Sequence, residues 1–143
     1  MKSTAHLGDA DLHAMATYLK ALPANAGDLG SAPPAAVLSA GSTVYDVQCG
    51  TCHLPTGLGG PDSGPRLAGS LVVQASDPSS LINIILYGAA LPEQATPPKD
   101  WKIMEAFGDK LSDDDIAALA SFLRSSWGNK AGAVTAAQVA KQR

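Results

Sequence analysis

Cys49-Gly50-Thr51-Cys52-His53 is the stretch of sequence that decides the fold. The preceding pattern predicts a helix over residues 38–50 that runs into this motif. Positions i, i+3 and i+4 of a helix share one face. The side chains of Cys49, Cys52 and His53 are therefore expected to point the same way.

The pattern C-x-x-C-H is the signature of covalent haem attachment. Two thiols at this spacing form thioether bonds with the haem vinyl groups, and the histidine then reaches the iron from the same side. The sequence therefore predicts one covalently bound haem c, attached through Cys49 and Cys52, with His53 as an iron ligand.

Three other interpretations of the cysteine pair are weaker. A thioredoxin-like redox pair needs a βαβ setting, and no strand is predicted. Half of a zinc site would need a second cysteine pair, and His6 and His13 lack ligand spacing. A disulfide between Cys49 and Cys52 would close too short a loop to stabilise the chain much.

An iron bound by His53 on one side needs a ligand on the other, and His/Met ligation suits a stable electron-transfer iron. Met1 begins the sequence, and Met15 lies in a predicted helix. Met104 follows His53 by 51 residues, in a predicted loop. Met104 is therefore predicted to be the second axial ligand; the alternative is that it only fills a gap in the core.

The rest of the pattern predicts an all-α fold. Helices are predicted over residues 7–22, 38–50, 78–87 and 113–127, and the segment 129–143 is expected to be a tail that is helical from Thr135. Asp77 is expected to cap one helix, with Pro78 in its first turn. Ser112 and Asp115 are expected to form a capping box at another.

Composition limits the function classes. The 143 residues suit one domain, and aromatic residues make up only 5%, so a buried cofactor could supply apolar bulk. The formal charge of −3 and the scattered basic residues argue against nucleic acid and against a membrane surface as partners. The first residues do not resemble a signal peptide. Because haem is normally attached outside the cytoplasmic membrane, a mature form or a fragment is expected.

Two segments match each other when offset by 104 residues, residues 7–20 over residues 111–124. Six positions are identical and five more are conservative exchanges, through both the acidic start and the apolar face. Such an internal repeat predicts that residues 7–22 close an earlier domain, as residues 111–127 close this one. The alternative is a chance likeness between two acidic-capped, alanine-rich helices.

With these motifs, residues 38–128 resemble a class I cytochrome c. The resemblance implies about three core helices around one haem. It implies that the Pro65 carbonyl, in Gly64-Pro65-Arg66-Leu67, accepts a hydrogen bond from the ligand histidine. It also implies that Tyr45 packs against the last helix, near Leu119 and Phe122.

Three further pieces are similar to the third haem domain of the triheme cytochrome subunits of membrane-bound alcohol, gluconate and sugar dehydrogenases: residues 77–82, 104–113 and 124–129. This resemblance implies a non-catalytic electron relay at the periplasmic face of the inner membrane. Its partners would be a dehydrogenase subunit and neighbouring haem domains, with quinone or an oxidase as acceptor and membrane association only through the complex. The implied organisation is a preceding-domain helix (1–22), a linker (23–37), the haem domain (38–128) and a tail (129–143).

The remaining candidates lie beside these motifs. Five further residues are expected around the cofactor: Pro65, Arg66, Leu67, Trp101 and Phe107. Of these, Arg66 and Trp101 are expected as partners for the haem propionates. Arg66 and Trp101 could equally be surface or packing residues. Glu105 stands where the family has proline after the ligand methionine, which predicts a less rigid loop and a lower potential.

Two competing functions remain open at this point. A freely diffusing monohaem carrier would need no neighbouring domain, so the repeat would carry no meaning. A haem enzyme or gas sensor would need an open iron site, so Met104 would not bind.

Overall fold

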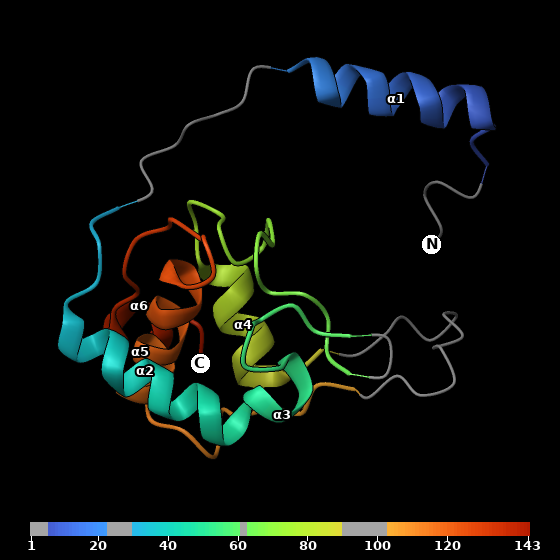
Figure 1. Ribbon diagram of the computed structural model, residues 1–143. Coiled ribbons are helices and arrows are strands. Elements are labelled where there is room, and N and C mark those ends of the chain that lie inside the picture. Colours follow the sequence, from blue (N-terminus) through green and yellow to red (C-terminus); the bar gives the residue numbers. More distant parts are fainter. Residues whose placement is uncertain (1–5, 23–29, 61–62, 90–102) are drawn as a thin grey trace.

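The computed structural model describes residues 6–22, 30–60, 63–89 and 103–143. These residues contain helices, loops and one isolated bridge between Ala89 and Met104, so the expected all-α class is confirmed. None of their helices has the length and apolar character that crossing a bilayer requires. The helices are α1 Asp9–Ala21, α2 Ala35–Gln48, α3 Gly50–His53, α4 Ser79–Tyr87, α5 Asp113–Ser125 and α6 Ala136–Ala140 (Figure 1).

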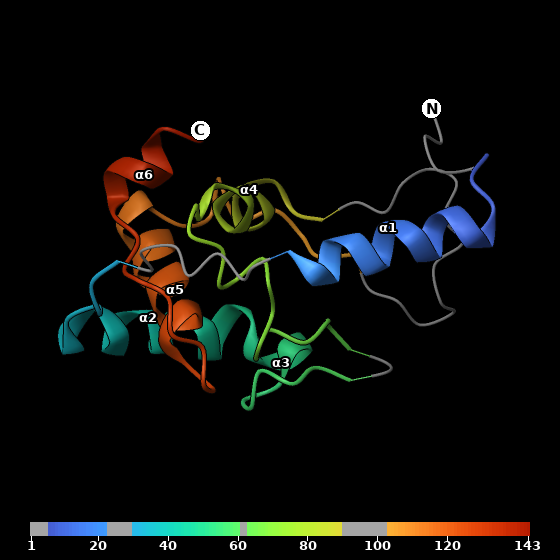
Figure 2. The same ribbon diagram turned by 90° about the horizontal axis from the view of Figure 1, so that it is seen from above.

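The core is built where α2 and α5 lie against each other (Figure 2). A β-carbon at Gly41 of α2 would lie 2.1 Å from the carbonyl oxygen of Ala118, so only glycine permits this approach. Tyr45 is 1% exposed, and its ring centroid lies 5.6 Å from that of Phe122 and 5.0 Å from that of Trp127. The expected packing of Tyr45 against the last core helix is confirmed.

The helix predicted over residues 38–50 has different ends. Pro34 is the N-cap, and its carbonyl accepts the backbone N–H of Leu38 at 3.1 Å, so α2 already begins at Ala35. At the other end, Cys49 leaves the helical region with φ −121° and ψ −33°. The attachment motif therefore occupies a separate short turn, α3.

Side chains set the starts of the next two helices. The predicted capping box is confirmed, because Ser112 Oγ accepts from the backbone N–H of Asp115 at 3.1 Å and Asp115 Oδ2 accepts from that of Ser112 at 3.2 Å. At α4 the N-cap is Pro78, one residue later than predicted. Asp77 still satisfies a first-turn donor, since its Oδ1 accepts the backbone N–H of Ser79 at 3.0 Å.

The segment after residue 128 packs on the domain. Its predicted helix is confirmed as α6, with Thr135 as N-cap. Val139 is 0% exposed and Val134 5%, and the backbone N–H of Val134 donates to Ser121 Oγ at 2.8 Å. The segment expected as a tail thus completes one side of the core.

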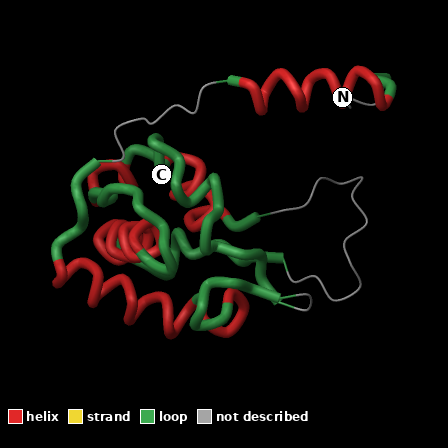
Figure 3. Tube along the Cα trace, turned by 45° about the horizontal axis from the view of Figure 1, so that its top comes forward, coloured by secondary structure: helices red, strands yellow, loops and turns green. Residues whose placement is uncertain are grey.

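In contrast, α1 has no buried residue and touches no other helix within the described residues (Figures 1 and 3). It has the same 13-residue length as α5. The backbone N–H of Gly8 donates to Asp11 Oδ2 at 3.1 Å, which repeats the bond between Ser112 and Asp115. The repeat in the sequence therefore extends to helix length and to helix start.

Candidate functional site

The attachment motif is positioned by one tight turn. The backbone N–H of Cys49 donates to the carbonyl of Tyr45 at 2.8 Å, which joins the turn to α2. The Cys49 carbonyl accepts from the N–H groups of Cys52 and His53 at 3.1 and 2.9 Å. The three functional side chains all line one cavity, so the expectation that they share one face is confirmed.

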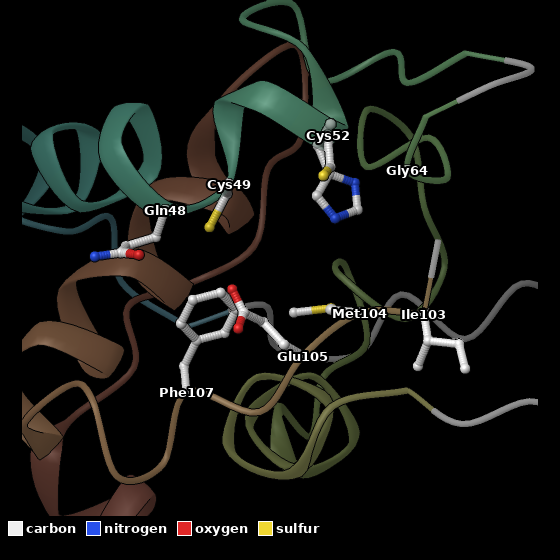
Figure 4. A pocket seen from close by; sticks show the side chains of 9 residues that line it. Gln48, Cys49, Cys52, Gly64, Ile103, Met104, Glu105 and Phe107 are labelled. Atoms are coloured by element: carbon white, nitrogen blue, oxygen red, sulfur yellow. The ribbon is translucent and has the colours of Figure 1, made fainter. Parts of the chain in front are cut away.

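This cavity measures about 320 Å³ and lies between the attachment turn and the segment that follows α4. Figure 4 shows Cys49 and Cys52 on one side and Met104, Glu105 and Phe107 on the other. The sulfur of Cys49 and the side chain of Met104 both point into the space. The remaining lining residues are Gln48, His53, Gly64 and Ile103.

The imidazole of His53 is held by a backbone carbonyl of the following loop. The residue is 7% exposed, and its Nδ1 lies 2.8 Å from the carbonyl oxygen of Pro65, the contact that the resemblance implies. With Nδ1–H donating to that carbonyl, Nε2 keeps its lone pair. A β-carbon at Gly64 would come within 2.8 Å of the ring. The loop before Pro65 therefore needs a residue without a side chain.

The opposite wall of the cavity is held by backbone hydrogen bonds to α4 and to the residues that follow it. The backbone N–H of Ala89 donates to the carbonyl of Met104 at 3.2 Å, and that of Phe107 donates to Ile85 at 3.0 Å. Phe107 is 4% exposed and packs in the core. Met104 is partly buried against the same core, so its thioether reaches the cavity from a fixed backbone.

The two thiols are unpaired. Burial, and in second place the charge of Cys52, raise the pKa of the Cys49 thiol to about 11. On the other wall, the carboxylate of Glu105 forms an exposed ion pair with Lys110, whose ammonium lies 5.3 Å from the centroid of the Phe107 ring.

Three other predicted residues are not among the described residues that line the cavity: Pro65, Arg66 and Leu67. Arg66 is exposed, and its Nε donates to the carbonyl of Ala68 at 2.7 Å. Leu67 packs against the core cluster, and Pro65 contributes its carbonyl. Trp101 falls outside the described residues. Contacts of Arg66, Leu67 and Trp101 with a haem remain predictions.

Gln48, Gly64 and Ile103 line the cavity without having been predicted. Gln48 and Ile103 directly precede Cys49 and Met104, and this adjacency was the available signal. Gly64 directly precedes the predicted Pro65 in the same way, but its approach to the His53 ring depends on how the loop folds.

Comparison with known proteins agrees with this geometry. The sequence model of a family described as cytochrome c oxidase, cbb3-type, subunit III matches residues 36–123. The chain belongs to the cytochrome c family. As a cytochrome c it binds haem c covalently and transfers electrons, and Cys49 and Cys52 fit the attachment motif of the family.

Several curated relatives are similar over 99% of the chain. The cytochrome c subunits of quinone-dependent alcohol dehydrogenases from Gluconacetobacter polyoxogenes and Gluconobacter oxydans are 40% and 38% identical to it. The gluconate 2-dehydrogenase cytochrome c subunit of Pantoea cypripedii is 37% identical. The chain spans about a third of the length of these relatives (32% to 34%).

Proposed function

We propose that the chain relays electrons through one haem whose iron lies between His53 and Met104. The observation that carries this proposal is that the two thiols, the imidazole and the thioether all line the same cavity. This donor set fits a haem with two thioether bonds and two axial ligands. The cofactor supplies the exchange of one electron between ferric and ferrous iron.

Each residue then has a defined task. Cys49 and Cys52 hold the cofactor covalently, and Pro65 orients the imidazole of His53 through its carbonyl. Phe107 is buried and supplies an apolar wall of the cavity. Met104 occupies the remaining axial position, which leaves no open site for a substrate.

Replacing Met104 with alanine tests the ligand assignment. The oxidised variant should lose the sulfur-to-iron charge-transfer band, should bind added imidazole or cyanide, and should react with peroxide. Met15→Ala is the matched control, because Met15 is 47% exposed on α1 and should leave the spectrum unchanged. An unchanged spectrum for Met104→Ala would refute the assignment.

We further propose that this domain is the last haem domain of a longer cytochrome subunit. The apolar side chains of α1 are exposed, while their partners in the repeat are buried in α5; the exposed fractions are 42%, 47% and 61% for Leu12, Met15 and Leu19, against 0%, 1% and 4% for Ile116, Leu119 and Leu123. A helix with this face needs a core of its own to cover it. That core would belong to a preceding haem domain.

The relatives support the same arrangement, because they are named as cytochrome c subunits of dehydrogenases and are about three times as long. In this proposal the domain takes electrons from a dehydrogenase or a neighbouring haem and passes them to quinone or an oxidase. It would act at the periplasmic face, with membrane association through the complex. Two further C-x-x-C-H motifs upstream in the reading frame would support this proposal; a signal peptide and a stop codon there would contradict it.

A further inference from the structure

The side chain of Arg143 lies against the Gly108–Leu111 turn, which follows the cavity residue Phe107. Its Nη1 donates to the carbonyl of Gly108 at 2.6 Å and its Nη2 to that of Leu111 at 2.9 Å. Its Nε donates to Asp113 Oδ1 at 2.5 Å. One guanidinium thus joins both ends of the turn to the start of α5.

The backbone that carries Arg143 is itself fixed to α4. The hydroxyl of Tyr87 donates to the main-chain oxygens of Gln142 and Arg143 at 2.6 and 3.2 Å. The amide of Gln142 accepts from Asn83 Nδ2 at 3.0 Å and donates to Ser79 Oγ at 3.2 Å. Arg143 therefore reaches the turn from an anchored position.

The chain from Met104 to Phe107 is held at its two ends, by the N–H of Ala89 on the carbonyl of Met104 and by the N–H of Phe107 on that of Ile85, while its middle is exposed. Glu105 and Ala106 are both exposed, and the ion pair of Glu105 with Lys110 is exposed too. After Phe107, the chain is held by the N–H of Gly108 on the carbonyl of Leu86 at 3.0 Å. Three residues join the Gly108–Leu111 turn to Met104, and of these Phe107 alone is buried and bonded to α4, so the position of the turn bears on Met104 through a short segment.

We propose that Arg143 is a positioning residue that keeps the Met104 thioether at the iron. This inference rests on the proposed His53/Met104 ligation. The planar guanidinium fork of Arg143 donates to two carbonyls and one carboxylate at once, a geometry that a lysine ammonium cannot reproduce. Without the fork the turn loosens, the sulfur leaves the iron more often, and an added ligand competes more easily.

The test compares three variants of the full haem-loaded chain. Arg143→Gln removes the fork and the charge, and Arg143→Lys removes the fork alone. Lys141→Gln removes a charge from an exposed neighbouring residue and is the matched control. The readouts are imidazole affinity of the oxidised protein, the sulfur-to-iron charge-transfer band, and the helical circular dichroism signal, which a general loss of structure would change.

Arg143→Gln and Arg143→Lys should both bind imidazole roughly 3- to 10-fold more tightly than the wild type, the range expected for hydrogen bonds of this kind. Both should have a weaker charge-transfer band and an unchanged helical signal, and Lys141→Gln should match the wild type. Wild-type affinity in Arg143→Lys would overturn the proposal, because charge alone would then explain the effect. Wild-type affinity in Arg143→Gln, or a loss of helical signal that accounts for the change, would also overturn it. A wild-type spectrum without the band would refute the Met104 ligation itself.

Discussion

Gly64 is required by the ring that it faces. The backbone N–H of Gly64 donates to the carbonyl of Cys52 at 2.6 Å, which brings the loop over the attachment turn. A β-carbon there would lie 2.8 Å from Cε1 and from Nδ1 of His53. Because Nδ1 also contacts the Pro65 carbonyl, any shift of the ring changes the bond that orients it.

Gly64→Ala should therefore destabilise the haem-loaded chain by about 1–3 kcal/mol, the usual cost of overpacking a tight site. Thermal unfolding followed by haem absorbance measures this loss. Gly60→Ala is the control, since among the described residues its β-carbon would meet the movable Ser63 hydroxyl, at 3.0 Å. Equal unfolding midpoints for the two variants would contradict the role given to Gly64.

The contribution of Asp77 to the stability of the fold, at the start of α4, depends on pH. Hydrogen bonds from the hydroxyl and the backbone N–H of Ser79 hold the pKa of this carboxyl below its usual value. A lowered pKa stabilises the fold above the unfolded-state pKa of about 3.9, and this contribution disappears as pH falls through the folded-state value. At pH 7 the thermal unfolding midpoint of the wild type should exceed that of Asp77→Asn. The difference between the two midpoints should narrow below about pH 3.9. A gap independent of pH would contradict this assignment.

At the scale of elements, Arg124 ties α5 to two loops. The residue is 2% exposed, and its Nε donates to the carbonyl of Gly132 at 2.8 Å. Its Nη1 donates to the carbonyls of Val73 and Ala75 at 3.0 and 2.7 Å. Burial lowers the pKa of Arg124, and the charge of Asp77 opposes this shift. The guanidinium holds the C-terminal segment and the loop before α4 on the same helix.

Arg124→Ala should cost about 3–5 kcal/mol of unfolding free energy, because it leaves buried carbonyl groups without donors. Denaturant unfolding of the haem-loaded chain measures this value. Arg66→Ala is the comparison, since Arg66 is exposed and its bond within the described residues goes to Ala68, two residues away. A cost below 1 kcal/mol for Arg124→Ala would show that the loops are held by other contacts.

The helices were predictable wherever local chemistry fixed them. Ser112 and Asp115 mark the start of α5 in the sequence itself, and Thr135 marks that of α6. The break at Cys49 was not predictable, because it depends on the backbone of one residue that ends α2. The burial of Val139 was missed as well, since its partners in α5 are distant in the sequence.

The same division holds in the site. Cys49, Cys52, His53 and Met104 followed from a motif and from spacing, and all four line the cavity. Gly64 and Arg143 were missed, because their contacts exist only once distant loops meet. Arg66 bonds through Nε to the carbonyl of Ala68 in its own loop, and its contact with the cofactor stays a prediction.

For the whole molecule, the repeat offers a matched pair of leucines. Leu123 in α5 is 4% exposed, and its equivalent Leu19 in α1 is 61% exposed. Leu123→Ala should cost about 2–5 kcal/mol of unfolding free energy. Leu19→Ala should stay within about 0.5 kcal/mol of wild type in this chain. A large cost for Leu19→Ala would mean that α1 packs on this domain, which would contradict its assignment to a preceding one.

Covalent attachment requires that Cys49 and Cys52 hold one haem in this cavity. The most direct measurement is the mass of the purified chain after full denaturation, for the wild type and for Cys49→Ala/Cys52→Ala. The wild type should retain the mass of one haem, and the double variant should lose all of it. Release of haem from the denatured wild type, or equal retention by the double variant, would contradict covalent attachment through these two cysteines.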